Sequence, residues 1–346
     1  MNFSTASDRI LQNAAALLGQ DSPSGFTRDA VALAEGIAQS AGYETSRPNR
    51  GGLMVHIPGR EAGTTVALCA HIDTLGLMVR SIAEDGSLRF TKVGGPVLPS
   101  LDGEYCTVVT RAGKRFSGTV LSLSPAAHVF PDSASRVRDE ENMYVRLDEV
   151  AHTKEEVRAL GIAPGDYICI DPKTVVTESG FLKSRFIDDK GGSACLLTLL
   201  ELMTEQKVRP KHDALFLFTV YEEVGHGGAI LPPEASELLA VDMGCIGADL
   251  TCTEQQVSIC AKDSAGPYDY EMVSRLIALA DGAKLDYAVD VYPYYSSDAA
   301  VAWKAGRDVR AALIGPGVHA SHGMERTHRD GLLNTLKLCA LYLDCQ

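Results

Sequence analysis

Two adjacent carboxylates, Glu222 and Glu223, stand directly after the apolar run ALFLFTV and just before the glycines of VGHGG. A compact apolar run bounded by polar residues is typical of a buried strand, so both acids lie where a core strand ends. An unpaired carboxylate is costly to bury, which favours a role that supplies a partner, such as metal binding or proton transfer. A solvated surface pair is the alternative that these two residues alone leave open.

Polar side chains also follow the other apolar runs of the sequence. Ligands of open α/β sheets bind at the carboxyl ends of the strands, so the residues after each run are candidates for a site. They are His71 and Asp73 after VALCA, Asp242 in AVDMG, Asp188 and Asp189 ahead of a predicted helix, and His319, His322 and His328 after AALIG.

Imidazole and carboxylate groups without cysteine are the ligands of a zinc, cobalt or manganese site. Three or more carboxylates with two histidines exceed the needs of one catalytic zinc, and two metals that share a bridging carboxylate fit this set better. Taken singly, a histidine after a strand can be a hydrogen-bonded structural residue, and an aspartate ahead of a helix can be its N-cap. Because five such features coincide at strand or helix ends, we favour the metal site.

The elements that must position these residues follow an α/β pattern at both ends of the chain. Helix-like and strand-like segments alternate up to about residue 77 and again from about residue 177. Between them, short strands joined by turns such as EDG and AGK are typical of a small β-barrel or sandwich. We therefore predict a catalytic α/β domain in two parts, residues 1–77 and 177–346, interrupted by an inserted β domain at residues 78–176.

Composition excludes several classes of function. The formal net charge of −13 argues against nucleic acid or an anionic membrane as a partner. The N-terminus lacks a basic segment followed by a continuous apolar stretch, and no run approaches eighteen apolar residues, so we expect a soluble cytoplasmic protein. Nine cysteines form no CxxC pair and mostly lie in apolar runs, as reduced core residues do.

These motifs, in this order, resemble the M42 family of metallo-aminopeptidases, which includes glutamyl and tetrahedral aminopeptidases. The resemblance spans almost the whole chain and rests on AHIDTLGLMV, DGSLRFTKVGG, IDDKGG, YEEVGHGGA, AVDMG, SSDA and HASHGMERTH. It implies a mixed sheet flanked by helices, of the zinc-peptidase type, with an inserted small β-barrel that serves dimerisation. It also implies self-association as a dimer or a tetrahedral dodecamer.

The resemblance further implies a role for each site residue. Asp188 would bridge two divalent metal ions, zinc or cobalt or else manganese, and Glu222 would be the general base. One ion would be completed by His71 and Asp242, and the other by Glu223 and His322. Asp73 would stand behind His71 and accept a hydrogen bond from its other ring nitrogen, which would fix the tautomer.

The sequence departs from the family pattern near the site. His226 and Gly227 occupy positions where relatives commonly carry Leu-Arg, and DTLG replaces the usual Asp-Glu-Ile-Gly after His71. Asp249 competes with Asp242 as a ligand, because the interval from Glu223 to Asp242 is short for the family. His319 and His328 compete with His322, which we prefer because ASHGME matches the family's histidine and nearby glutamate.

The function that follows is removal of N-terminal residues from short peptides by a metal-activated water. In this mechanism Glu222 accepts a proton from the water and returns it to the departing amine. The nearest alternative is a metal-dependent deacylase or amidohydrolase acting on a small N-acyl or amidated metabolite. An endoglucanase-type glycoside hydrolase and a non-catalytic binding protein are further alternatives, although adjacent Glu222 and Glu223 would not straddle a glycosidic bond.

Overall fold

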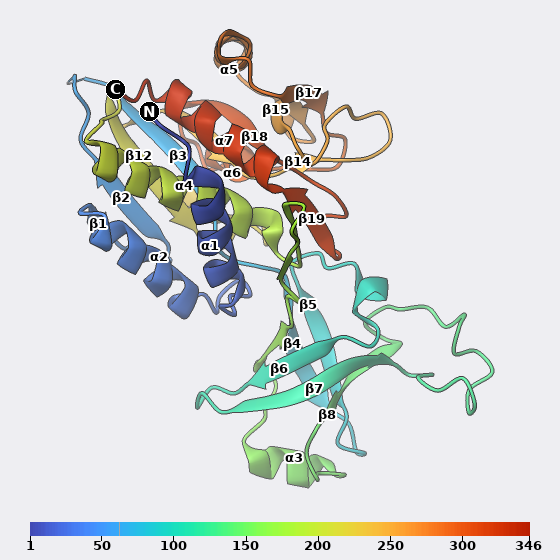
Figure 1. Ribbon diagram of the computed structural model, residues 1–346. Helices are drawn as coiled ribbons and strands as arrows, with labels where there is room; N and C mark the ends of the chain where they lie inside the picture. Colours follow the sequence, from blue (N-terminus) through green and yellow to red (C-terminus); the bar gives the residue numbers. More distant parts are fainter. Residues whose placement is uncertain (62) are drawn as a thin grey trace. The chain divides into compact units, whose positions relative to one another are not determined.

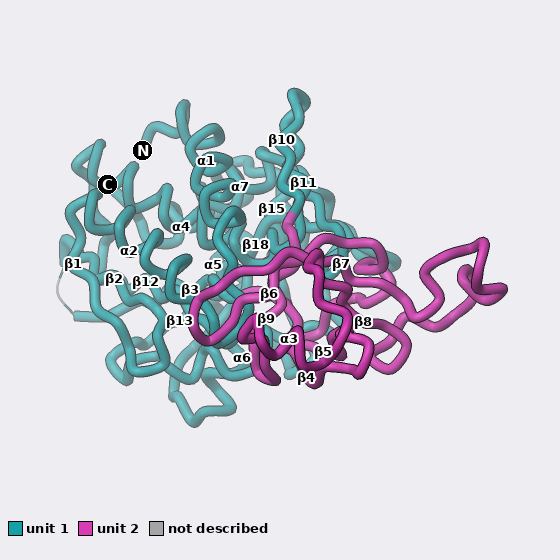
Figure 2. The backbone as a smooth tube through the Cα atoms, turned by 90° about the horizontal axis from the view of Figure 1, so that it is seen from below, with its two compact units in different colours: residues 1–73, 173–346 teal, residues 74–172 magenta. Residues whose placement is uncertain are grey.

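The computed structural model describes residues 1–61 and 63–346, which divide into two compact units (Figures 1 and 2). Unit 1 consists of residues 1–73 and 173–346, and unit 2 of residues 74–172. Unit 2 is therefore an insertion in the sequence of unit 1. The α/β class with an inserted β-barrel, expected from the sequence, is confirmed.

Unit 1 is built on a mixed ten-stranded sheet in the order β1-β2-β12-β3-β13-β18-β15-β16, with β14 beside β18 and β17 beside β15. Its strands are β1 (Glu44–Ser46), β2 (Leu53–Ile57), β3 (Thr65–His71), β12 (Asp213–Thr219), β13 (Ala235–Val241), β14 (Gly244–Cys245), β15 (Val257–Asp263), β16 (Gly266–Pro267), β17 (Tyr287–Val291) and β18 (Arg310–Val318).

The centre of this sheet is parallel. β3 pairs in parallel with β12 on one side and with β13 on the other, and β13 continues in parallel to β18. Almost every residue of β3 and β12 is buried, which explains why both read as unbroken apolar runs. Because the central strands run the same way, the residues that follow them emerge at one edge of the sheet.

The helices of unit 1 are α1 (Ala6–Leu18), α2 (Arg28–Ser40), α4 (Ile187–Gln206), α5 (Tyr270–Ala283), α6 (Asp298–Lys304) and α7 (Arg329–Tyr342). α4 packs against β3 and is covered by α1, α2 and α7 (Figure 1). Residues 187–200 are therefore buried on every side. Residues 194–200 are mainly apolar, as a helix buried all round requires, whereas residues 188–190 are charged.

A second, three-stranded sheet of unit 1 joins distant parts of the sequence. It runs in the order β10 (Val175–Val176), β11 (Phe181–Ser184) and β19 (Glu325–His328). β11 leads directly into α4, and β19 follows the turn that carries His322. The antiparallel pairing of β11 with β19 therefore brings that turn to the N-terminus of α4.

Unit 2 is a closed barrel of six strands in the order β4-β5-β8-β7-β6-β9. The strands are β4 (Gly76–Ile82), β5 (Leu88–Val93), β6 (Tyr105–Val109), β7 (Arg115–Ser122), β8 (Met143–Leu147) and β9 (Tyr167–Ile170), accompanied by the helix α3 (Lys154–Leu160). Alternating buried residues of these strands fill its interior, including Leu77, Phe90 and Val145. Closure leaves the barrel without open sheet edges.

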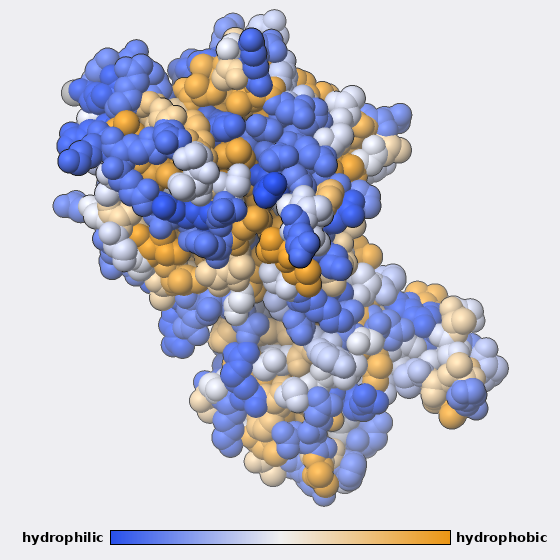
Figure 3. Space-filling view, in the orientation of Figure 1, coloured by the Kyte–Doolittle hydropathy of each residue, from blue (hydrophilic) through white to orange (hydrophobic). Residues whose placement is uncertain are grey.

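The face drawn in Figure 3 is mainly hydrophilic, with apolar residues scattered in small groups. Within the described ranges, no helix has the length and apolar composition needed to cross a lipid bilayer. All nine cysteines are described, and each is a free thiol.

Candidate active site

The candidate site lies where the parallel strands of unit 1 end. His71 is the last residue of β3, Asp242 follows the end of β13, and Glu222 and Glu223 follow β12 by a few residues. Asp188 lies at the start of α4, in a stretch whose backbone is not yet helical. The central parallel pairing and the N-terminus of α4 thus place five polar side chains at one edge of the sheet.

One group of these side chains surrounds the Nε2 atom of His71. Asp188 Oδ1 lies 3.1 Å from this nitrogen, Glu222 Oε2 lies 3.9 Å away and Asp242 Oδ2 lies 4.0 Å away. The His71 side chain is only 1% exposed. Three carboxylates therefore converge on one buried imidazole nitrogen, an arrangement that suits a shared cation.

A second group forms around the Nε2 atom of His322. It lies 3.7 Å from Asp188 Oδ2 and 3.5 Å from Glu223 Oε2. The two oxygens of Asp188 thus face two different histidines. The His322 side chain is 36% exposed, so the cluster opens to solvent on this side.

Asp189 also lies near His71, and a set of His71, Asp189 and Asp242 atoms falls within 4.8 Å. Both of its carboxylate oxygens already accept backbone hydrogen bonds, Oδ2 from the His71 amide and Oδ1 from the Gly192 amide, each at 3.0 Å. Asp189 therefore fastens the end of β3 to the first turn of α4. A second set, His71, Asp188 and Glu223, lies within the same 4.8 Å limit. Asp188 Oδ2 accepts a hydrogen bond from the Ser321 hydroxyl at 3.1 Å, and neither Asp188 oxygen accepts one from a backbone amide of the described chain.

Asp73 differs from the expectation in how it supports His71. The hydrogen bond of His71 Nδ1 goes to the backbone carbonyl of Asp73 at 2.9 Å, while the carboxylate oxygen Oδ1 lies 3.6 Å away. The carboxylate instead accepts hydrogen bonds from the Ser24 hydroxyl and from the amides of Glu222 and Glu223. Asp73 thus orients the ring through its backbone and the two glutamates through its side chain.

The competing ligands named from the sequence lie apart from this cluster. Asp249 is exposed, whereas Asp242 is 4% exposed and faces His71. His319 is exposed and pairs through its backbone with Arg326. His328 caps α7, because its Nδ1 accepts a hydrogen bond from the Asp330 amide, and its Nε2 contacts the Ser179 carbonyl. The ring of His226 stacks on Tyr221.

Glu325, the glutamate of ASHGME, is a buried acid whose role is not evident from the sequence. Its two oxygens accept hydrogen bonds from the amides of His322 at 3.0 Å and Asp188 at 3.1 Å. Burial, together with the nearby charge of Asp188, raises the pKa of Glu325 to about 8. The short spacing between His322 and Glu325 in HGMER is the sequence feature that could have indicated this role. The structure explains the spacing, because Glu325 accepts a hydrogen bond from the His322 amide.

The electrostatics of the cluster are dominated by buried negative charge. Burial raises the pKa of Glu222 and Glu223 well above the usual range and that of Asp242 to about 7. Burial would lower the pKa of His71, but the hydrogen bond to Asp188 and the other nearby acids raise it well above its ordinary value. More acids than cations are enclosed here, so the site favours positive ligands.

The individual ligand atoms of the cluster show whether it suits a metal ion. Glu223 Oε1 is buried and has no hydrogen-bond partner among the residues that the structure describes. Such an orphaned carboxylate oxygen is expensive in a protein interior unless a cation satisfies it. The donor set of imidazole nitrogens and carboxylate oxygens, without thiolate, is also the set that zinc, cobalt and manganese accept. The residues therefore fit divalent metal ions.

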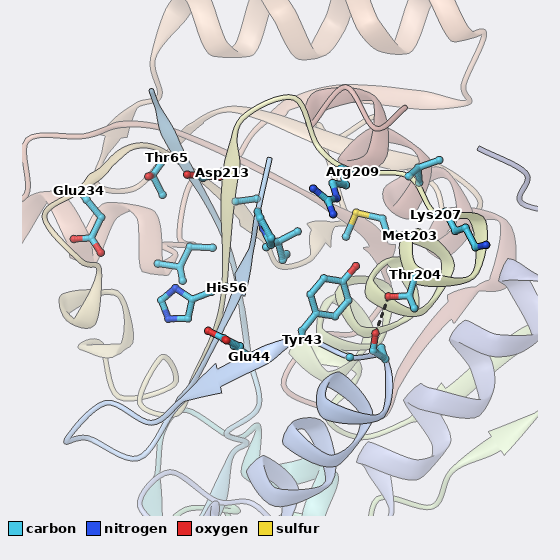
Figure 4. Close-up of a pocket in the computed structure, with 17 residues that line it drawn as sticks. Tyr43, Glu44, His56, Thr65, Met203, Thr204, Lys207, Arg209, Asp213 and Glu234 are labelled. Carbon is cyan, nitrogen blue, oxygen red and sulfur yellow. Dashed lines mark hydrogen bonds between the residues drawn. The ribbon is translucent and has the colours of Figure 1, made fainter. Parts of the chain in front are cut away.

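A cavity of about 1010 Å³ lies elsewhere in unit 1 (Figure 4). Its lining includes Thr65 and Asp213, the first residues of β3 and β12, and Tyr43 with Lys207 and Arg209. His71 and Thr219 are the last residues of the same strands. The cavity is thus at the opposite end of the strands from the carboxylate cluster.

A mixed α/β sheet with a buried histidine and carboxylate cluster at the carboxyl ends of its parallel strands is the arrangement of a metal-binding hydrolase. The sequence model of the M42 glutamyl aminopeptidase family matches residues 51–338, and the chain belongs to this family. It is therefore a peptidase of the aminopeptidase type. Neither the deacylase nor the glycoside hydrolase alternative is favoured by this membership.

Individual relatives agree with the family. YhfE of Bacillus subtilis, an aminopeptidase by name, is 42% identical over 328 residues, covering 94% of this chain and 95% of its own. An aminopeptidase structure from the archaeon Desulfurococcus kamchatkensis superposes with a TM-score of 0.89 at 21% identity, over 98% of this chain and 95% of that chain. The TET1 peptidase of Pyrococcus horikoshii superposes with a TM-score of 0.83 at 20% identity, over 96% and 99% of the two chains.

Proposed function

We propose that this enzyme removes N-terminal residues from short peptides with the help of two divalent metal ions held by its carboxylate cluster. The observation that carries the proposal is the disposition of Asp188, whose Oδ1 faces His71 at 3.1 Å while Oδ2 faces His322 at 3.7 Å. A carboxylate shared in this way is the bridge that a two-metal site requires.

In this proposal the ligands divide into two sets around Asp188. His71 and Asp242 hold one ion, and Glu223 and His322 hold the other. When bound, such ions lower the pKa of water and stabilise negative charge on a substrate carbonyl oxygen. Zinc or cobalt would suit these ligands best, with manganese as an alternative.

The remaining chemistry belongs to the chain's own groups. Glu222 accepts a proton from the water that attacks the first peptide carbonyl, and it donates that proton to the departing amine nitrogen. Burial raises the pKa of Glu222, which brings its proton affinity closer to that of an activated water. The Asp73 carboxylate accepts hydrogen bonds from the amides of Glu222 and Glu223, so it keeps both glutamates in place beside His71.

Self-association is a further part of the proposal. The P. horikoshii TET1 peptidase, which shares the fold, is described as assembling into a tetrahedron or a large octahedral shell. We propose that this chain also forms a homo-oligomer, a dimer or a tetrahedral dodecamer, and that unit 2 mediates its assembly. The mass of the purified protein in solution distinguishes the two. The nine free thiols agree with a reducing compartment, and we propose the cytoplasm as the location.

The test of the activity compares metal-stripped enzyme with enzyme reloaded with zinc, cobalt or manganese. The substrates are a panel of aminoacyl p-nitroanilides and the matched N-acetylated compounds, and bound metal per chain is measured on the same samples. The proposal expects about two metals per chain and metal-dependent cleavage of the free-amine substrates only. Release of acetate from the acetylated compounds instead would favour the deacylase. Absence of metal binding would overturn the two-metal site.

A further inference from the structure

The segment that carries both glutamates is an irregular loop. It leaves β12 at Thr219 and ends at the 3-10 turn Gly227–Ile230. Inside it, Gly225 donates a hydrogen bond to the Glu222 carbonyl and His226 donates one to the Tyr221 carbonyl. These local bonds shape the loop, but they do not connect its two ends to the rest of the domain.

The Thr219 carbonyl accepts a hydrogen bond from the Ile72 amide at 2.9 Å, and the His226 carbonyl accepts one from Arg50 at 2.9 Å. Asp298 is the residue whose side chain binds both ends. It is the first residue of α6, is 3% exposed, and comes from a segment far away in the sequence. Its Oδ2 accepts a hydrogen bond from the Thr219 hydroxyl at 2.5 Å, and its Oδ1 accepts one from the Gly228 amide at 2.5 Å. One buried carboxylate thus binds the residue that begins the loop and a residue that closes it.

The two glycines of the loop show how closely it packs on Asp298. A Cβ atom at Gly227 would lie 2.6 Å from Asp298 Oδ1, and one at Gly228 would lie 1.9 Å from the Asp298 carbonyl oxygen. Neither distance leaves room for a side chain. Gly227 and Gly228 of GHGG and Asp298 of SSDA therefore form one contact, which explains the two glycines and the aspartate.

We infer that Asp298 is a positioning residue that holds Glu222 and Glu223 in their working places by closing the ends of their loop. This role rests on the proposed function of the two glutamates. Asp73 binds the middle of the loop through the Glu222 and Glu223 amides, and Asp298 binds its ends. Without Asp298, the Thr219 hydroxyl and the Gly228 amide lose their acceptor, and Glu222 could shift away from His71, now 3.9 Å distant, at the cost of catalysis.

The inference predicts different effects for two substitutions at one position. Asp298→Ala removes both acceptors, and because a shift of about 1 Å in a catalytic group can cost 10²-fold, kcat is expected to fall about 100-fold with KM nearly unchanged. Asp298→Asn can still accept from the Gly228 amide and can donate its NH₂ group to the Thr219 hydroxyl oxygen. It is therefore expected to retain kcat within about threefold of the wild type.

Thr219→Val provides a second route if Asp298→Ala does not fold. It keeps the shape of the side chain and removes one of the two bonds, so kcat is expected to fall about tenfold. The matched control is Thr335→Val, which removes the equally buried hydroxyl that bonds the Gly331 carbonyl within α7. A loss of kcat in Thr335→Val equal to that in Thr219→Val would overturn the inference, as would an inactive Asp298→Asn variant.

Amide hydrogen exchange of residues 219–228 separates this inference from the proposed function. The positioning role expects faster exchange of this loop in Thr219→Val and Asp298→Ala than in the wild type and in Thr335→Val. Unchanged exchange would overturn the role even if the enzyme is an active aminopeptidase. Conversely, faster exchange in Thr219→Val and Asp298→Ala, together with a wild-type protein that has no peptidase activity, would uphold the contact and overturn the proposed function instead.

Discussion

Asp188 Oδ1 lies 3.1 Å from Nε2 of His71, and this contact joins the start of α4 to the end of β3. Its other oxygen is directed to the second histidine of the cluster. Because the Asp188 carboxylate faces both His71 and His322, its removal should weaken metal binding at both histidines.

Asp188→Asn tests this expectation. The amide cannot provide two anionic oxygens, so we expect both metals to be bound weakly and kcat/KM to fall by more than about 100-fold. Metal content after dialysis and kcat/KM on an aminoacyl p-nitroanilide are the measurements. Asp249→Asn, at an exposed aspartate, is the matched control and should behave as wild type. Retention of two metals by Asp188→Asn would contradict the bridging role.

Glu222→Gln separates proton transfer from metal binding. Glutamine keeps the size of the side chain but cannot accept a proton from water, so kcat should fall by about 10²–10⁴-fold while the metals remain. The measurements are kcat under saturating substrate and metal content by elemental analysis. A variant that loses its metals as well would mean that Glu222 is a ligand rather than the base.

The stability of the metal-free protein should decrease as pH rises from about 5.5 to about 8. Buried carboxyl groups have raised pKa values in the native state, Asp242 at about 7, so the native state holds protons that the unfolded chain has already lost above about pH 4. The raised pKa of His71 acts in the same direction, because its favourable contacts are lost as it deprotonates. Thermal unfolding at the two pH values measures the effect.

Added zinc should reverse this trend at pH 8, since it binds the deprotonated ligands and only the native state. Asp242→Asn should show a weaker pH dependence than wild type when both are metal-free. A melting temperature of the metal-free wild type that rises between the two pH values would contradict the assignment of raised pKa values.

Glu237 provides a test of stability away from the site. This buried acid at the other end of β13 accepts hydrogen bonds from Arg275, from Arg310 at 2.6 Å and from the Tyr342 hydroxyl at 2.5 Å. Glu237→Gln should lower the free energy of unfolding by about 1–3 kcal/mol, because the arginine contacts lose their charge partner. Chemical denaturation measures the loss, and kcat at 25 °C should stay unchanged. A variant with wild-type stability would show that these contacts contribute little.

Much of unit 1 could be predicted from the sequence because its central strands are buried on both faces. Such strands appear as unbroken apolar runs, so the ends of β3, β12 and β13 could be located and the residues after them named. The long helices were equally visible from their apolar spacing. The domain limits predicted from the sequence lie at residues 77/78 and 176/177. The two compact units of the structure divide at residues 73/74 and 172/173.

Other features depend on the backbone in space and were not visible. α6 spans seven residues, too short to show a helical period, so no helix was predicted at SSDA and the role of Asp298 was missed. The use of the Asp73 carbonyl rather than its carboxylate by His71 is a matter of local geometry. The backbone geometry at the start of α4 likewise decides that, within the described part of the chain, Asp189 and not Asp188 accepts hydrogen bonds from backbone amides.

The residues of the cluster are spread widely along the chain, from His71 on β3 to His322 in the turn before β19. Protein synthesis makes His71 early and His322 last of the set, after every strand of the parallel centre has been translated. A nascent or broken chain that ends before residue 322 therefore holds most of the acids but lacks the second histidine. With the proposed ligand set, hydrolytic competence is expected only after residue 322 has been translated.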